Sequence, residues 1–168
     1  MARSEEELKT AVLEAQTASD IASLYVLEQE VYEVFDEDTL NGFYAYILDL
    51  ALEKLTDTLE SHRKMDMKEV QDFATTRALY EYAMEHYSAG DDKDAAALFE
   101  VLSGLTNDAK FSSSLKLHWA AATENLSLDN FLSKIADLDE TEKMGTFYIS
   151  EFQKEAQELL DNSQTKGE

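Results

Sequence analysis

The sequence predicts an all-α protein, because turn residues are scarce, helix formers are abundant and apolar residues recur at helical spacing. No proline and only five glycines occur among the 168 residues, and these are the residues that most often interrupt helices. Alanine, leucine, glutamate, lysine and methionine, which favour helices, dominate the composition. We expect a single-domain helical bundle of six to eight helices over residues 1–160, followed by a polar, disordered tail over 161–168.

The N-terminal half contains the strongest helix signals. Ser4 and Glu7 form a capping box in front of an apolar series at helical spacing, and a second apolar run, Ile21 to Phe35, follows. An acidic cluster then starts the most periodic segment of the chain, Leu40 to Glu60, with nine apolar positions on one face. We expect this helix to be central to the fold, and we place the weakest seam of the chain near Met65.

The C-terminal half predicts a series of shorter helices. A helix with apolar positions from Val70 to Tyr87 ends at Gly90, as helices often end at glycine. Asp91 to Asp94 then start another helix, which ends before Thr106. The remaining expected helices cover Phe111 to Thr123, Leu128 to Ile135 and Thr141 to Leu160.

The charge of the chain excludes two classes of partner. It carries 36 acidic and 14 basic side chains, for a formal net charge of −22. Each contact with a nucleic-acid phosphate or an anionic lipid needs a cation that this chain lacks, so we expect neither nucleic acid nor membrane as a partner. No apolar stretch approaches the roughly 18 residues of a membrane span, and the acidic start is unlike a signal peptide. These features favour a cytoplasmic protein.

Patterns of cofactor and catalytic sites are also missing from the sequence. There is no cysteine, which rules out thiolate zinc sites, iron–sulfur clusters and cysteine catalysis. His62, His86 and His118 belong to no Glu-x-x-His pattern of the kind that builds a helical di-iron site. No phosphate-binding glycine loop occurs either. We expect no metal and no organic cofactor, and we do not expect an enzyme.

One segment has the spacing of a helical repeat motif. The residues at the packing and turn offsets of a tetratricopeptide repeat are Leu79, Ala83, Gly90, Ala95, Phe99 and Leu102. In such a hairpin the two alanines let antiparallel helices approach, Gly90 makes the turn, and Phe99 fills the space behind. A degenerate second copy follows over 111–136. An ordinary αα-hairpin would have the same features.

Over about residues 77–137 the chain resembles the small tetratricopeptide-type chaperones of type III and flagellar secretion systems. Its length and its pI of about 4.3 are similar as well. The resemblance implies a concave helical surface that holds an export substrate before secretion, lined from the first helix of each repeat. By offset, the partner-binding residues would be Arg77, Tyr80, Met84, Tyr87, Phe111 and His118.

Two functional hypotheses follow. The first is a cytoplasmic chaperone or adaptor of an export or flagellar type, which binds another protein, either basic or an export substrate, and whose acidic rim speeds association. The alternative is a small helical enzyme or ligand-binding protein, with carboxylates and His86 or His118 between helices. Tyr80, Met84 and Tyr87 have two open interpretations: they line a partly exposed groove, or they belong to the core.

Overall fold

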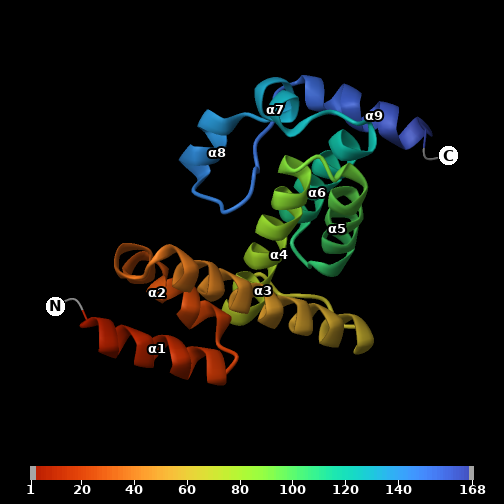
Figure 1. Ribbon diagram of the computed structural model, residues 1–168. Helices are drawn as coiled ribbons and strands as arrows, with labels where there is room; N and C mark the ends of the chain where they lie inside the picture. The colour runs from red at the N-terminus through yellow and green to blue at the C-terminus, as the bar shows by residue number, and fades with distance from the viewer. Residues whose placement is uncertain (1–2, 167–168) are drawn as a thin grey trace. The chain divides into compact units, whose positions relative to one another are not determined.

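The computed structural model describes residues 3–166 and confirms the predicted all-α class (Figure 1). An isolated antiparallel bridge joins Ala136 and Phe152. The described part of the chain contains nine α-helices and one π-helical segment: α1 (Glu5–Thr17), α2 (Ile21–Val34), α3 (Glu37–Glu60), α4 (Val70–Ser88), α5 (Asp92–Leu105), α6 (Ala109–Thr123), α7 (Leu128–Asn130), η1 (Phe131–Ile135), α8 (Leu138–Met144) and α9 (Glu155–Lys166).

The chain divides into two compact units, residues 1–78 and 79–168, where the sequence predicted one domain. The boundary falls inside α4 and not near Met65, where we expected the weakest seam. Met65 is itself only 1% exposed, although it lies in the non-helical segment that joins α3 to α4. The segment that joins α3 to α4 therefore belongs to the N-terminal unit.

The N-terminal unit begins with three helices whose first turns are capped by polar side chains. Ser4 and Glu7 form the expected capping box of α1, since the Glu7 N–H donates to the Ser4 hydroxyl (3.1 Å) and the Ser4 N–H donates to the Glu7 carboxylate (3.2 Å). Asp20 and Asp36 accept N–H hydrogen bonds at the starts of α2 and α3. These caps satisfy N–H groups that have no partner within the helix.

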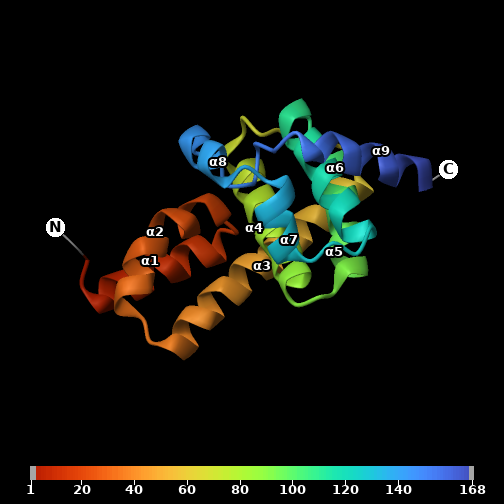
Figure 2. The ribbon, with the colours of Figure 1, turned by 90° about the horizontal axis from the view of Figure 1, so that it is seen from above.

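Packing between these helices buries one face of each. Helix α1 packs on α2 and α2 packs on α3, and the three helices lie side by side in both views (Figures 1 and 2). Deeply buried apolar side chains of the three helices include Leu8, Leu24, Val31, Phe43, Ile47 and Ala51. The long helix predicted over Leu40 to Glu60 is confirmed as α3 and contributes three of these side chains.

The first half of α4 is held to α2 and α3 by a charged cluster. The guanidinium of Arg77 lies over the Tyr25 ring, 3.9 Å from the ring centroid. Its Nη2 atom donates to Oε1 of Glu28 (3.1 Å), and the Tyr44 hydroxyl donates to the other oxygen of the same carboxylate (2.8 Å). One carboxylate thus receives hydrogen bonds from two elements of this unit, which fixes the position of Arg77.

The C-terminal unit contains the helical hairpin that the sequence predicts around Gly90. Gly90 has a φ of +85°, which only glycine adopts readily, at the turn between α4 and α5. Ala83 and Ala95 have no exposed surface, and the Phe99 ring packs against the Tyr80 ring with their centroids 6.4 Å apart. This geometry fits a tetratricopeptide-type hairpin and an ordinary αα-hairpin equally, so the repeat remains a prediction.

The helix expected from Thr141 to Leu160 is wrong. Helix α8 ends at Met144, where Gly145 adopts a left-handed conformation with a φ of +69°. Residues 145–154 then run without helix until α9 begins. The aromatic residues of this segment have a spacing that also suits a helix, but they contact the aromatic core from a non-helical stretch. Their packing therefore overrides the helical pattern.

Helix α9 replaces most of the expected disordered tail. It begins at Glu155 and continues to Lys166, so the first part of the 161–168 segment is helical. Ser163 is 1% exposed, and its hydroxyl donates to the Leu159 carbonyl (3.0 Å). Packing of α9 on α6 explains this order, because it gives one face of a polar sequence a surface to bury against. Residues 167–168 of the expected tail lie outside the described residues.

Candidate binding groove

The C-terminal unit buries most of the residues that the sequence predicts to bind a partner. The buried ones, which are between 0% and 4% exposed, are Tyr80, Tyr87, Phe111 and His118. Of the two interpretations left open, the core one therefore describes Tyr80 and Tyr87, and Phe111 and His118 are buried as well. Arg77 and Met84 remain partly exposed, but Arg77 is engaged by Glu28 in the N-terminal unit. A buried ring offers no surface to a partner while its unit stays folded.

Tyr80 and His118 form a hydrogen-bonded pair inside this aromatic core. The His118 Nδ1 atom lies 2.7 Å from the Ser114 carbonyl, so we assign the proton to Nδ1. The Nε2 atom then accepts from the Tyr80 hydroxyl (2.7 Å), and the Tyr80 oxygen accepts from the N–H of Ile149 (3.1 Å). Burial lowers the pKa of His118 to about 4 and raises the pKa of Tyr80. Both groups are neutral at pH 7, and the pair ties the non-helical segment to α4 and α6.

The two histidines of the alternative hypothesis differ in burial. The ring of His118 is enclosed by the rings of Tyr80, Phe99, Phe131 and Phe152. His86 is partly exposed, and its Nδ1 atom lies 3.4 Å from the carboxylate of Asp91. Within the part of the chain that the structure describes, no three His, Asp or Glu side chains converge in a way that could hold a metal ion.

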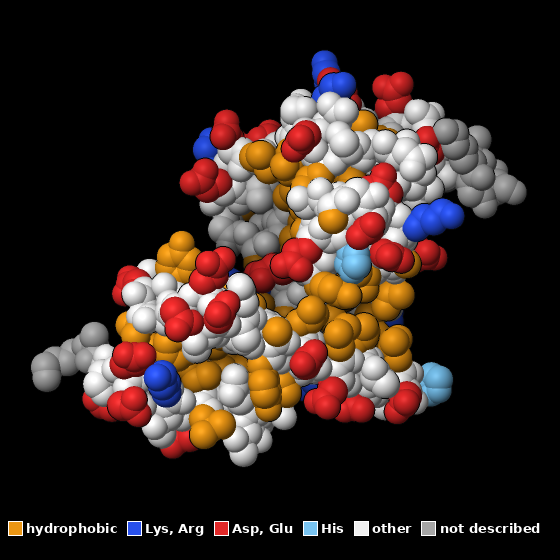
Figure 3. Space-filling view, viewed as in Figure 1, with side chains coloured by type: hydrophobic (Ala, Val, Ile, Leu, Met, Phe, Trp, Pro, Cys, Tyr) orange, Lys and Arg blue, Asp and Glu red, His pale blue; other side chains and the backbone are white. Residues whose placement is uncertain are grey.

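An apolar groove lies between α1 and α3 in the N-terminal unit. It has a volume of about 340 Å³, and its lining residues are Lys9, Val12, Leu13 and Gln16 from α1, Phe35 at the end of α2, and Thr39, Gly42 and Phe43 from α3. On each helix the lining residues are three or four positions apart or adjacent, so they share one face. The space-filling view shows hydrophobic side chains at the surface over this part of the chain, among acidic ones (Figure 3).

Two large side chains at or next to the groove are exposed to solvent, although they are largely apolar. Leu13 is 62% exposed, although its neighbour Val12 is only 7% exposed. Tyr46 is 40% exposed and continues the lining face of α3 by one turn beyond Gly42. Isolated surface leucines are common, but here the exposed side chains adjoin an apolar hollow, which is typical of an interaction site.

Gly42 leaves the floor of the groove open. It lies inside α3, where glycine costs about 0.5–1 kcal/mol relative to alanine. A Cβ atom at this position would meet nothing within 4 Å, and Gly42 is not among the glycines with positive φ. Neither packing nor backbone conformation therefore requires glycine, and its effect is to leave space beside Phe43.

Carboxylates surround the end of the groove where α1 and α3 begin. Glu5 and Glu6 lie in the first turn of α1, and Asp36 and Asp38 lie at the start of α3. Among the residues that line the groove, Lys9 is the single cation, and its Nζ atom lies 3.4 Å from the Glu5 carboxylate. A groove with an apolar lining and carboxylates near one end is complementary to an apolar ligand that carries positive charge at its edges.

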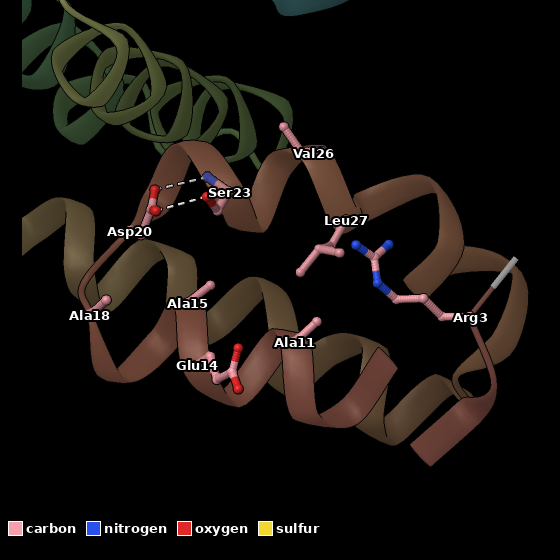
Figure 4. A pocket seen from close by; sticks show the side chains of 9 residues that line it. All are labelled: Arg3, Ala11, Glu14, Ala15, Ala18, Asp20, Ser23, Val26 and Leu27. Atoms are coloured by element: carbon pink, nitrogen blue, oxygen red, sulfur yellow. Dashed lines mark hydrogen bonds between the residues drawn. The ribbon is translucent and has the colours of Figure 1, made fainter. Parts of the chain in front are cut away.

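Two further hollows lie elsewhere in the described residues. One, of about 350 Å³, lies between α1 and α2, where Arg3 extends over the opening toward Leu27 (Figure 4). Its polar groups are engaged within the chain, since Arg3 pairs with Glu30 (2.7 Å) and Asp20 accepts from Ser23 (3.0 Å). The second, of about 230 Å³, is lined by Glu100, Ser103, Lys116, Trp119 and Leu160.

Sequence reasoning missed the groove, although two signals were present. Leu13 falls outside the apolar series of α1, which passes through Val12, so it has no place in the helix core. Gly42 interrupts the most periodic helix of the chain. Either feature alone is common, and only the structure places both in the lining of one hollow.

No protein-family model, curated protein or solved structure matches this chain. Within the described residues, no helix is both long and apolar enough to cross a membrane. Three features mark the groove as the candidate site: exposed apolar side chains, open space over Gly42 and nearby acidic residues.

Proposed function

We propose that the protein is a cytoplasmic chaperone or adaptor that binds a segment of another protein in the groove between α1 and α3. The observation that carries the proposal is the exposure of Leu13, at 62%, beside an apolar hollow of about 340 Å³. Leaving a leucine in water forgoes about 1.5–3 kcal/mol that burial would provide. A bound segment that covers Leu13 and Tyr46 would recover part of this free energy.

The charge of the chain supports a basic partner. The formal net charge of −22 attracts positively charged segments over long range and raises the rate of association. The same charge repels phosphate backbones and anionic lipids. If the sequence resemblance of residues 77–137 to tetratricopeptide-type secretion chaperones extends to function, that partner is an export substrate.

A quantitative pull-down with matched variants tests this function. The bait proteins are the unaltered chain, a Leu13→Gln variant and a Leu59→Gln control, in which the replaced leucine is 48% exposed on α3 but does not line the groove. Both replacements remove an exposed leucine without changing the charge. We expect the unaltered chain and the control to retain the same protein at near-stoichiometric amounts, and the Leu13→Gln variant to lose it.

The proposal fails if no protein is retained in proportion to the bait. It also fails at this site if Leu13→Gln retains the partner as well as Leu59→Gln does. Circular dichroism of the three proteins checks that each remains helical, which we expect because both leucines are exposed and contribute little to the core.

A further inference from the structure

We infer that the segment bound in the groove is an amphipathic helix with lysine or arginine along its edges and a bulky apolar side chain that enters the space over Gly42. This inference rests on the proposed function, because it specifies the occupant of the same groove.

The walls of the groove favour a helix over an extended segment. Both walls are helices, whose main-chain groups are already hydrogen-bonded within α1 and α3. An extended segment would bring its own N–H and C=O groups onto an apolar surface, where the polar partners are limited to Lys9, Gln16 and Thr39. A helix satisfies these groups internally and packs its side chains between two neighbouring helices. With its 13 residues, α1 is about 20 Å long, which matches a partner helix of similar length.

Gly42 leaves room for a bulky side chain of the partner. A Cβ atom at Gly42 would meet nothing within 4 Å, and Gly42 lines the groove together with the apolar side chains of Val12 and Leu13. A leucine or phenylalanine of the partner can occupy this open space and contact the apolar lining. Filling the opening from within the chain should therefore compete directly with the partner.

The acidic residues near the groove favour basic residues along the edges of the partner helix. They disfavour a second copy of this chain as the partner. Glu6 precedes Leu13 by two turns, and Asp38 precedes Gly42 by one turn. The hydrogen bonds from Thr39, and after them the charge of Lys9, lower the pKa of Asp36, so this carboxylate is ionised at neutral pH. Lysine or arginine at the partner's edges would face these carboxylates. Two copies that each carry −22 would repel instead.

Three synthetic peptides of about 14 residues test the inference. All three carry leucine at helical spacing along one face. The remaining positions combine alanine with lysine in the first peptide, with glutamine in the second and with glutamate in the third. Binding to the full chain is measured by fluorescence anisotropy at low and at moderate salt. We expect the lysine peptide to bind at least about tenfold more tightly than the glutamine peptide, with an advantage that shrinks as salt rises. The glutamate peptide should bind least.

Two glycine variants test the role of the opening. Gly42→Leu fills the groove, and Gly104→Leu is the control, because a Cβ at Gly104 in α5 also meets nothing within 4 Å. Both replacements favour helix, so both proteins should remain folded, as circular dichroism would confirm. We expect Gly42→Leu to lower the affinity for the lysine peptide by about tenfold or more. Gly104→Leu should leave this affinity unchanged.

The outcomes separate this inference from the function on which it rests. Equal binding of the three peptides, or undiminished binding to Gly42→Leu, overturns the inference, whatever the pull-down shows. Undiminished binding of the lysine peptide to Leu13→Gln also overturns it, because attraction to the acidic surface as a whole would then explain the affinity. If Leu13→Gln loses the cellular partner while no peptide binds, the groove function stands and the basic helix is wrong.

Discussion

Acidification should destabilise the C-terminal unit through His118. This residue has no exposed surface, and burial lowers its pKa to about 4, whereas an unfolded chain holds histidine near its ordinary pKa of about 6.5. As the pH falls, the unfolded state therefore takes up the proton first. The stability contributed by neutral His118 is complete above about pH 6.5 and is lost progressively until about pH 4.

The two pKa values set the size of this effect. At about 1.4 kcal/mol per pKa unit, their separation corresponds to a total loss of about 3 kcal/mol, of which about 2 kcal/mol falls between pH 7 and pH 5. Burial is the main reason why the folded state resists the proton, and the geometry at Nε2 adds to it. A proton on Nε2 would point at the Tyr80 oxygen, which already accepts from the N–H of Ile149 (3.1 Å), and the Tyr80 hydroxyl would lose its acceptor.

Urea unfolding at a series of pH values between 7 and 5 measures the effect. Carboxylates also titrate at the acidic end, so the contribution of His118 is the difference in slope between the unaltered chain and a His118→Gln variant. A matching His86→Gln variant controls for loss of a partly exposed histidine. If His118→Gln keeps the same dependence on pH as the unaltered chain, or if NMR shows His118 titrating near pH 6.5 in the folded protein, our reasoning about its burial is wrong.

Three further predictions concern single contacts, each measured by urea or thermal unfolding. Tyr80→Phe removes the hydroxyl between His118 and Ile149 and should lower the free energy of unfolding by about 1–3 kcal/mol. Tyr82→Phe, its control at a partly exposed ring, should change this free energy by less than about 0.5 kcal/mol. Gly90→Ala should destabilise by about 1 kcal/mol because of its φ of +85°, while Gly104→Ala, inside a helix with open space, should stabilise by about 0.5–1 kcal/mol. Arg77→Met should cost about 1 kcal/mol through loss of its contacts with Glu28 and the Tyr25 ring, and equal stability would show that these contacts contribute nothing.

Local signals in the sequence predicted the fold class and several element ends. The capping box of Ser4 and Glu7 and the turn at Gly90 depend on neighbouring residues alone, and the structure contains both. The segment around Phe147 and Phe152 was mispredicted because the same spacing serves a helix or an extended chain whose rings enter a core. That choice depends on residues far away in the sequence, such as Tyr80.

The candidate site was harder to predict than the fold. Tyr80 and Tyr87 do share one stripe of α4, as the spacing indicates, but the stripe faces inward. A residue's type and spacing define a face of a helix, whereas neighbouring elements decide whether that face meets water. Leu13 became informative only once its exposure and the space near Gly42 were known.

The non-helical segment 145–154 has a consequence for digestion of the protein by proteases. Segments outside helices are usually the first to be cut, because a protease must draw several residues of main chain into its active site. Here Tyr148, Ile149 and Ser150 are each no more than 8% exposed, and the N–H of Ile149 is bound to Tyr80. Cleavage in this segment therefore requires the aromatic core to open first, and its rate at neutral pH follows the stability of the C-terminal unit.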